Sequence, residues 1–287
     1  MSTDPNWIAV YSGKVRELYR LETHPGVLLM VATDRVSAFD YILEPEIPGK
    51  GNVLTEITDW WFAQFPTVPN HLIDATSLAE IEPLVPERFQ GRSMLVRSLK
   101  MFPIECVVRG YLAGSAWAEY QESSTACGHA LPGGLSFGDK LPEPIYTPAF
   151  KAPVGEHDEN ISFERTVELV GFEVAVKLRD LSLQVYTEAA SIAEQKRLLL
   201  ADTKFEFGVD DKGVIRLADE VLTSDSSRYW DEGSWRDGMR KESFDKQIVR
   251  DWLAANWDRT GHPPRLPDHI VLETAKRYRE LQTRLTE

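Results

Sequence analysis

The sequence has few cysteines, no long apolar run and no excess of basic residues. Cys106 and Cys127 are its two cysteines, which excludes a disulfide framework and gives no metal-binding spacing. Cys106 stands in an apolar run, where we expect a buried free thiol. No stretch reaches the roughly 18 apolar residues that a membrane span needs, and no signal peptide is visible. These features predict a cytoplasmic protein without a membrane partner.

The charge balance is acidic, with 32 Lys and Arg against 45 Asp and Glu and a net charge of -13. This balance argues against a nucleic-acid binder. It stays compatible with a small phosphorylated ligand, because a bound metal and a few cations reverse the sign within one pocket. At 287 residues and 43% apolar content, the chain can bury a core in two modest domains, or in one large domain with an appendage.

The first hundred residues are predicted to be mostly strands. Residues 8–11 and 15–19 are expected to form two strands around the turn Ser12-Gly13-Lys14. The apolar run 27–33 fits a buried strand. Further strands are expected over residues 93–97 and 104–109. A helix is expected over roughly residues 53–65.

Helices and loops become more frequent after residue 109. A helix is predicted near residues 115–121, followed by a stretch rich in proline and glycine over 123–160 that we expect to be an irregular, functional or disordered loop. An apolar stripe at spacings of three and four predicts a long helix over 174–192. Strands follow at 202–207 and 214–218, then amphipathic helices at 243–256 and 268–285. The order of these elements argues against a Rossmann sheet.

The segment from Asp202 to Gly208 carries the most informative charge pattern. Residues two apart in a strand share a face, so Asp202, Lys204 and Glu206 are expected to point one way and the aromatic side chains the other. An ordinary half-exposed strand would explain the same pattern.

The second strand of this pair runs directly into the acidic residues Asp219 and Glu220. Across the hairpin, Glu206 and Asp219 could approach each other and hold Mg²⁺ on ATP phosphates, because Mg²⁺ prefers one or two carboxylates plus phosphate oxygens. The sequence does not fix the register of the hairpin. The polar run 223–228 follows and is too rich in hydrogen-bonding groups for a mere turn, although a turn is the simplest explanation of this segment taken alone.

A strand that ends at Arg109 leads through small residues to Ser115, which we expect to cap a helix. A helix N-terminus beside an arginine is a natural phosphate site. The alternative is an ordinary capped helix with a surface arginine.

Three further segments are weaker candidates. The turn Ser12-Gly13-Lys14 could lie over nucleotide phosphates, as glycine-rich loops of kinase type do, although it is not a Walker A loop and such turns are common. The polar run 32–40 follows a buried strand, where an Asp-Arg pair could equally fix a turn. His157 lies between acidic residues, but its spacing matches no zinc pattern.

Seven segments together resemble the SAICAR synthetase family, in that family's order, from residue 11 to about 250. They read YSGKVRELY, ATDRVSAFD, IPGKGNVLTEIT, ECVVRGYLAGSAW, GEHDENIS, LADTKFEFG and LADEVLTSDSSRYWD. The resemblance implies a two-lobed α+β fold, distantly kinase-like, with ATP between the lobes. An antiparallel-sheet lobe with the ATP phosphate loop would span residues 1–103. A larger α+β lobe with the metal and ribonucleotide sites and the C-terminal helices would span residues 104–287.

The resemblance also implies the reaction and its cofactors, ATP and Mg²⁺. L-aspartate and the carboxylate of 5-amino-1-(5-phosphoribosyl)imidazole-4-carboxylate (CAIR) would be joined to give SAICAR, ADP and phosphate, in purine biosynthesis. An acyl phosphate is the expected intermediate, because a carboxylate is a poor acceptor for an amine. The oligomeric state is left open.

The family's functional residues would fall on the following positions. ATP would be bound by Lys14, Val15, Arg16, Lys100 and Met101. Mg²⁺ would be bound by Glu206 and Asp219. The ribonucleotide would be held by Arg109, Ser115, Asp202, Lys204, Asp225 and Arg228. The catalytic residues would be Lys151, Asp158 and Lys204. L-aspartate would meet Asp34, Arg35, Ser37 and Lys50.

The long 123–160 stretch and the C-terminal helices resemble the longer form of the family, and no fused carboxylase is visible. Two alternatives use the same residues differently. A phosphotransferase on a kinase-like scaffold would use Lys14, Glu206 and Asp219 but would not need aspartate. A nucleotide-binding regulatory module would bind ATP without turnover.

Overall fold

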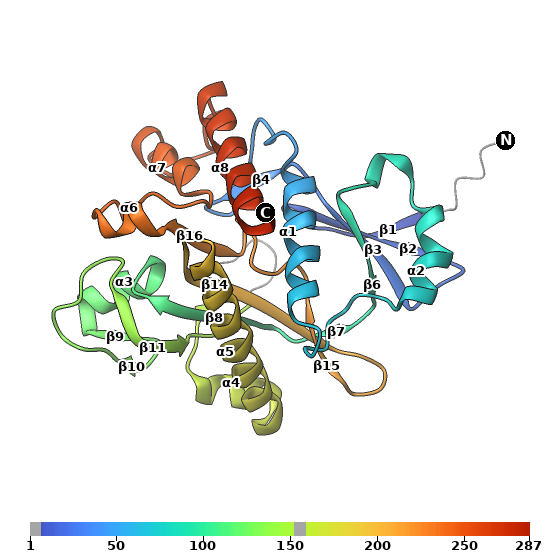
Figure 1. Cartoon of the computed structure of the whole chain (residues 1–287), viewed down its shortest axis with the longest axis horizontal. Helices are drawn as coiled ribbons and strands as arrows, with labels where there is room; N and C mark the ends of the chain where they lie inside the picture. Colours follow the sequence, from blue (N-terminus) through green and yellow to red (C-terminus); the bar gives the residue numbers. More distant parts are fainter. Residues whose placement is uncertain (1–6, 152–158) are drawn as a thin grey trace. The chain divides into compact units, whose positions relative to one another are not determined.

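The computed structural model describes residues 7–151 and 159–287, which fall into two compact units (Figure 1). Unit 1 is drawn from Met1–Lys100, Gly208–Glu220 and Ile248–Glu287. Unit 2 is drawn from Met101–Phe207 and Val221–Gln247. The division expected at residue 103 lies close to the break after Lys100, but the C-terminal helices group with unit 1 and not with the second lobe.

Unit 1 is built on an antiparallel sheet in the order β1-β2-β3-β6. Its strands are β1 (Trp7–Ser12), β2 (Arg16–Leu21), β3 (Val27–Ala32) and β6 (Ser93–Arg97). Alternate side chains of β3 point to opposite faces. Leu29 and Val31 pack in one cluster with Ile81 of α2 (Ala75–Ile81), whereas Met30 belongs to a second cluster. The predicted strands of this region are confirmed.

Helix α1 (Lys50–Gln64) lies against β3 and β6. It begins three residues before the predicted helix start. Short 3₁₀ turns at Glu82–Leu84 and Glu87–Phe89 connect α2 to the sheet.

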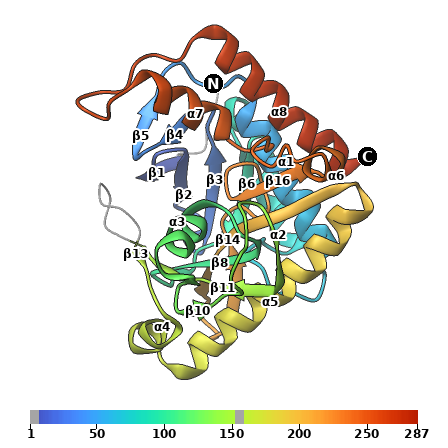
Figure 2. The same ribbon diagram turned by 90° about the vertical axis from the view of Figure 1, so that its left-hand side faces the viewer.

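The C-terminal helices α7 (Gln247–Asn256) and α8 (Asp268–Thr286) explain why unit 1 is discontinuous. Helix α8 packs along α1. Side chains of α7 and α8 also form an apolar cluster with the hairpin of β4 (Val36–Ala38) and β5 (Tyr41–Leu43). Figure 2 shows the course of these helices and of the hairpin. Burial of these apolar stripes attaches the end of the chain to its beginning.

Strand β15 (Ile215–Ala218) is also fixed within unit 1. The Leu217 amide donates to the Pro69 carbonyl at 2.8 Å, and the His71 amide donates to the Leu217 carbonyl at 3.0 Å. These bonds hold the residues that follow, Asp219 and Glu220, inside unit 1.

Unit 2 is an antiparallel sheet centred on β8 (Ile104–Tyr111), which pairs with β14 (Leu198–Val209). Further strands of this sheet in unit 2 are β7 (Lys100–Met101), β11 (Lys140–Tyr146), β12 (Ala149–Phe150), β13 (Glu159–Asn160) and β16 (Ser227–Asp231). Strands β9 (Thr125–Ala126) and β10 (His129–Ala130) pair with each other in a separate two-stranded sheet. The helices are α3 (Gly114–Ser123), α4 (Phe163–Val170), α5 (Phe172–Gln195) and α6 (Glu232–Arg236). Antiparallel sheets with helices make the protein α+β, as predicted.

The expectation of an irregular loop over 123–160 is wrong for the part that the structure describes, which contains β9 to β13. Strand β11 pairs with β8 at Lys140 and again at Ile145, with an irregular step between them. Pro142 and Pro144 lie in that step. Proline has no amide hydrogen to donate to a neighbouring strand, so a segment rich in proline is not predicted to be a strand. Strand β11 nevertheless forms, because it pairs with β8 before and after its two prolines.

Helix α5 packs on β8 and β11, as Figure 1 shows. The Tyr186 hydroxyl donates to the Leu200 carbonyl at 2.6 Å. A Cβ atom added at Gly110 would lie 2.1 Å from that hydroxyl oxygen. Gly110 is therefore required where the helix meets the sheet.

Gly110→Ala is expected to lower the free energy of unfolding by about 1–3 kcal/mol, because the methyl group overpacks a buried contact. Urea unfolding monitored by tryptophan fluorescence would measure it. Gly133→Ala is the control, since nothing lies within 4 Å of its added Cβ. Equal midpoints for the two variants would contradict the close contact.

Candidate active site

Strand β14 carries one charged face and one apolar face. Phe205 and Phe207 are fully buried, whereas Asp202 and Lys204 are half-buried on the opposite face. Glu206 shares that charged face and is 8% exposed. The alternation predicted for this strand is confirmed.

Arg109 of β8 lies directly opposite Asp202 in the antiparallel pair. Its Nη1 donates to Asp202 Oδ2 at 2.7 Å, its Nη2 donates to Ser115 Oγ at 3.0 Å, and its Nε donates to Thr147 Oγ1 at 3.0 Å. These three hydrogen bonds therefore fix the orientation of the guanidinium beside the start of α3.

Ser115 does not cap α3 as predicted. The helix begins at Gly114, with Ala113 as its N-cap and no side-chain cap. Gly114 has a φ of +61°, which an L side chain rarely adopts, so the chain turns into the helix one residue earlier than the sequence indicated. The hydroxyl of Ser115 is available to Arg109 for this reason.

Arg228 of β16 is the second arginine at this place, and its side chain is 12% exposed. Its Nη1 lies 3.5 Å from Asp202 Oδ2 and has no hydrogen-bond partner among the described residues. A Cβ atom at Gly114 would lie 3.3 Å from Arg228 Nη1 and 3.5 Å from Arg109 Nη1. Two guanidinium groups thus face the N-terminus of α3, an arrangement that fits a phosphate.

A row of alternating charges continues along the same strands. Lys204 Nζ lies 2.6 Å from Glu105 Oε1 and 3.9 Å from Glu206 Oε1. Lys151 Nζ lies 2.7 Å from Glu206 Oε2. The two carboxylates are buried and the two ammonium groups are more exposed. Such ammonium groups can bind a carboxylate or a phosphoryl group.

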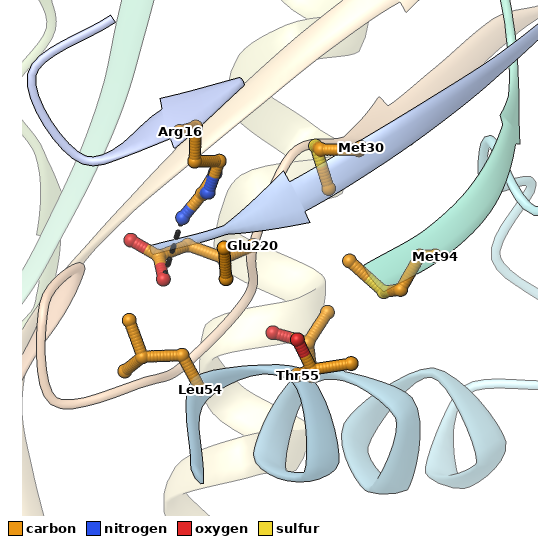
Figure 3. A pocket seen from close by; sticks show the side chains of 8 residues that line it. Arg16, Met30, Leu54, Thr55, Met94 and Glu220 are labelled. Carbon is orange, nitrogen blue, oxygen red and sulfur yellow. Dashed lines mark ion pairs between the residues drawn. The ribbon is translucent and has the colours of Figure 1, made fainter. Parts of the chain in front are cut away.

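In unit 1, Arg16 at the start of β2 forms an ion pair with Asp219. It forms a second one with Glu220 at 2.6 Å, which Figure 3 shows. Asp219 has a φ of +60°, so the chain turns sharply at the end of β15. The neighbouring His71 is buried, and burial together with the positive charge of Arg16 lowers its pKa to about 3. His71 therefore stays neutral and leaves the charge of Arg16 to the two carboxylates.

Beneath Arg16 lies a cavity of about 10 Å³. Met30, Met94, Leu54 and Thr55 line it, as Figure 3 shows. This volume holds about one water molecule, so the cavity is too small for a nucleotide base.

The turn that contains Lys14 and Val15 is tied to the end of β3. The Val15 carbonyl accepts hydrogen bonds from the amide and the hydroxyl of Thr33 at 3.0 and 2.8 Å. Arg35 donates to the Gly13 carbonyl at 3.2 Å. Lys14 forms an ion pair with Asp40. Arg35 thus supports the turn from inside unit 1.

The residues predicted to meet L-aspartate have different surroundings. Asp34 accepts the backbone amides of Gly49 and Gly51 at 3.0 and 2.8 Å, so its carboxylate fixes the start of α1. Lys50 is 1% exposed, and Ser37 is half-buried in β4.

The remaining candidate residues are placed as follows. Lys100 and Met101 are exposed in β7. Asp225 is half-buried as a residue, and its side chain is 3% exposed. Asp158 lies outside the described residues. Within residues 7–151 and 159–287, no group of three or more His, Cys, Asp or Glu could hold a metal ion. Glu206 belongs to unit 2 and Asp219 to unit 1.

Sequence reasoning missed several residues that touch the candidates, including Glu105, Thr147 and Asp40. Glu105 had a signal, because it lies four residues before Arg109 and so shares its face of β8. Thr147 gave no such signal, since it reaches Arg109 from 38 residues away.

Comparisons with known proteins identify the family. A family model described as SAICAR synthetase matches residues 9–264. A phosphoribosylaminoimidazole-succinocarboxamide synthase of Leifsonia xyli is 61% identical over 298 residues, covering 100% of this chain and 99% of the relative.

Solved structures agree as well. The SAICAR synthase of Saccharomyces cerevisiae complexed with SAICAR has a TM-score of 0.84 and 39% identity, over 100% of this chain and 96% of that one. A SAICAR synthetase in complex with ADP has a TM-score of 0.71 and 25% identity, over 96% and 97%. The predicted α+β fold is thereby confirmed, and the chain belongs to the SAICAR synthetase family.

Proposed function

We propose that the chain is an ATP-dependent carbon–nitrogen ligase that joins L-aspartate to CAIR, giving SAICAR, ADP and phosphate in de novo purine biosynthesis. The observation that carries this function is the 61% identity to a named synthase over the whole chain. The likeness to an ADP complex supports the use of ATP.

The ribonucleotide's 5′-phosphate is assigned to Arg109, Arg228, Ser115 and the start of α3. Two observations support this assignment. Arg228 Nη1 is buried without a hydrogen-bond partner among the described residues, and charge-assisted bonds from arginine are strong for phosphate. Gly114 leaves open the space next to both guanidinium groups.

The imidazole carboxylate is assigned to Lys204 and Lys151, which lie on either side of Glu206. Transfer of the γ-phosphoryl group of ATP to this carboxylate gives an acyl phosphate and ADP. The aspartate amine then attacks the acyl carbon, phosphate leaves, and the nitrogen loses a proton. The two ammonium groups would stabilise the negative charge of the carboxylate and of the transferring group. Asp158 remains a catalytic candidate.

Mg²⁺ is assigned to Glu206 and Asp219. In this structure Glu206 forms an ion pair with Lys151, and Asp219 forms one with Arg16. The surroundings of both carboxylates therefore accommodate a positively charged group. Two carboxylates plus phosphate oxygens are a donor set that suits Mg²⁺. When bound, the ion would neutralise charge on the β- and γ-phosphates.

ATP is assigned to Lys14, Val15 and Arg16 for its phosphates and to the exposed Lys100 and Met101 for its base. L-aspartate is assigned to Asp34, Arg35, Ser37 and Lys50, with Asp34 acting through the start of α1.

The proposed setting is cytoplasmic, with these small molecules as partners and without nucleic acid. Among the helices that the structure describes, none combines the length and the apolar character needed to cross a membrane.

The test is ADP release by the purified chain with Mg-ATP, CAIR and L-aspartate, each omitted in turn. Turnover that requires all three, with one SAICAR for each ADP, is the expected result. ADP release without aspartate would replace the ligase with a phosphotransferase. ATP binding without turnover would favour a regulatory module.

A further inference from the structure

Asp245 stands in the segment between β16 and α7 and is 5% exposed. Its Oδ1 accepts hydrogen bonds from the Ser243 hydroxyl and from the Gln247 amide, the latter at 2.9 Å. Its Oδ2 lies 3.8 Å from Nε of Arg228. One oxygen therefore fixes the carboxylate to its own segment while the other faces the guanidinium.

Arg228 is held between two carboxylates without donating a hydrogen bond to either. Asp202 lies 3.5 Å from its Nη1, and Asp245 lies 3.8 Å from its Nε. Burial tends to lower the pKa of Arg228, but attraction to Asp202 and Asp245 raises it overall, so the group stays charged. Nη1 keeps its hydrogens for another partner.

We propose that Asp245 is a positioning residue, which holds Arg228 so that Nη1 points to the ribonucleotide's phosphate beside Gly114. This inference rests on the proposed function, which places that phosphate there. Without the charge of Asp245, Asp202 is the remaining carboxylate beside the guanidinium. A shift of a few tenths of an ångström would then bring Nη1 into hydrogen-bond distance of Asp202, and the phosphate would lose that donor.

Lys246, which follows Asp245 in the sequence, supports the proposed positioning role of this segment. Lys246 Nζ lies 3.9 Å from Oδ1 of Asp225, a second candidate for the ribonucleotide. Two consecutive side chains of one segment therefore reach two residues of the candidate site. This segment therefore orients residues proposed to bind the ribonucleotide without itself being assigned to the ligand, as the outer partners of metal ligands do.

The test is steady-state kinetics of Asp245→Asn. The KM for CAIR is expected to rise about 10–100-fold, with the KM for ATP unchanged and kcat nearly unchanged. Asp139→Asn is the matched control, because it breaks the ion pair with Arg240 in the same unit and touches no candidate residue. Both KM values unchanged in Asp245→Asn, or both raised alike, would overturn the inference.

A double-mutant cycle separates the inference from the function on which it rests. In an Arg228→Gln background, Asp245→Asn is expected to add no further rise in the KM for CAIR. Effects that multiply would show that Asp245 does not act through Arg228. An unchanged KM for CAIR in Arg228→Gln alone would instead remove the phosphate from this place.

Ser243→Ala provides a second route if Asp245→Asn does not fold. The Ser243 hydroxyl donates to Asp245 Oδ1, so its loss loosens the carboxylate without removing its charge. We expect a smaller rise, about 3-fold, in the KM for CAIR alone. An unchanged KM would overturn the inference.

Discussion

Asp219→Asn is expected to lower kcat about 1,000-fold or more while the protein remains folded. The carboxylate is proposed to bind the Mg²⁺ that neutralises the phosphates of ATP, and loss of such an interaction in the transition state costs several kcal/mol. Rapid-quench measurement of ADP formation would detect the loss directly.

Asparagine is the right replacement because of the backbone. Asp219 has a φ of +60°, and asparagine tolerates that conformation far better than alanine does. A loss of activity is then due to the charge and not to strain. Asp211→Asn, in the exposed turn of the same hairpin, is the matched control. Near-normal turnover by Asp219→Asn would remove this residue from the metal site.

Gly114→Ala is expected to raise the KM for CAIR about 100-fold with little change in the KM for ATP. The new methyl group would lie 3.3 Å from Arg228 Nη1 and 3.5 Å from Arg109 Nη1, in the space assigned to a phosphate oxygen. Misplacement of a binding group by about 1 Å can cost about 100-fold. Steady-state kinetics with each substrate varied in turn would measure the split.

The control for this variant is Gly128→Ala in the same unit. Gly128 has a φ of +83°, so alanine brings a comparable backbone strain, but nothing lies within 4 Å of the added Cβ. We expect a modest loss of stability and unchanged KM values. If both variants raise the KM for CAIR equally, the strain and not the blocked space would be responsible.

Local patterns predicted the parts of the protein that obey simple periodicity. The face of β14 that carries Asp202, Lys204 and Glu206 followed from the alternation of a strand. The long helix α5 and the helix α8 followed from apolar residues at helical spacing. The family resemblance supplied the two-lobed α+β fold, which no periodic pattern could supply.

Other features depend on contacts between distant residues. Serine is a common N-cap residue, so Ser115 is expected to precede the first turn of the helix. The helix starts at Gly114 instead, because the left-handed backbone conformation of Gly114 fixes where α3 begins. Strand β11 could not be recognised through its prolines, since its pairing depends on β8. The partnership of Lys204 with Glu105 spans 99 residues. Asp34 is proposed to meet L-aspartate, and no local pattern could show that its carboxylate also accepts the backbone amides of Gly49 and Gly51.

The discontinuity of unit 1 has a consequence for synthesis on the ribosome. The sheet of β1, β2, β3 and β6 is complete within the first hundred residues, but α8, which packs along α1, comes from residues 268–286. The side of α1 that α8 covers must therefore stay uncovered while more than half of the chain is made, although β3 and β6 are already available to the rest of the helix. Unit 2 is contained within residues 101–247 and can be completed earlier. Apolar surface that is exposed in a nascent chain is a target for chaperones and for aggregation, and this exposure ends only when α8 has been made.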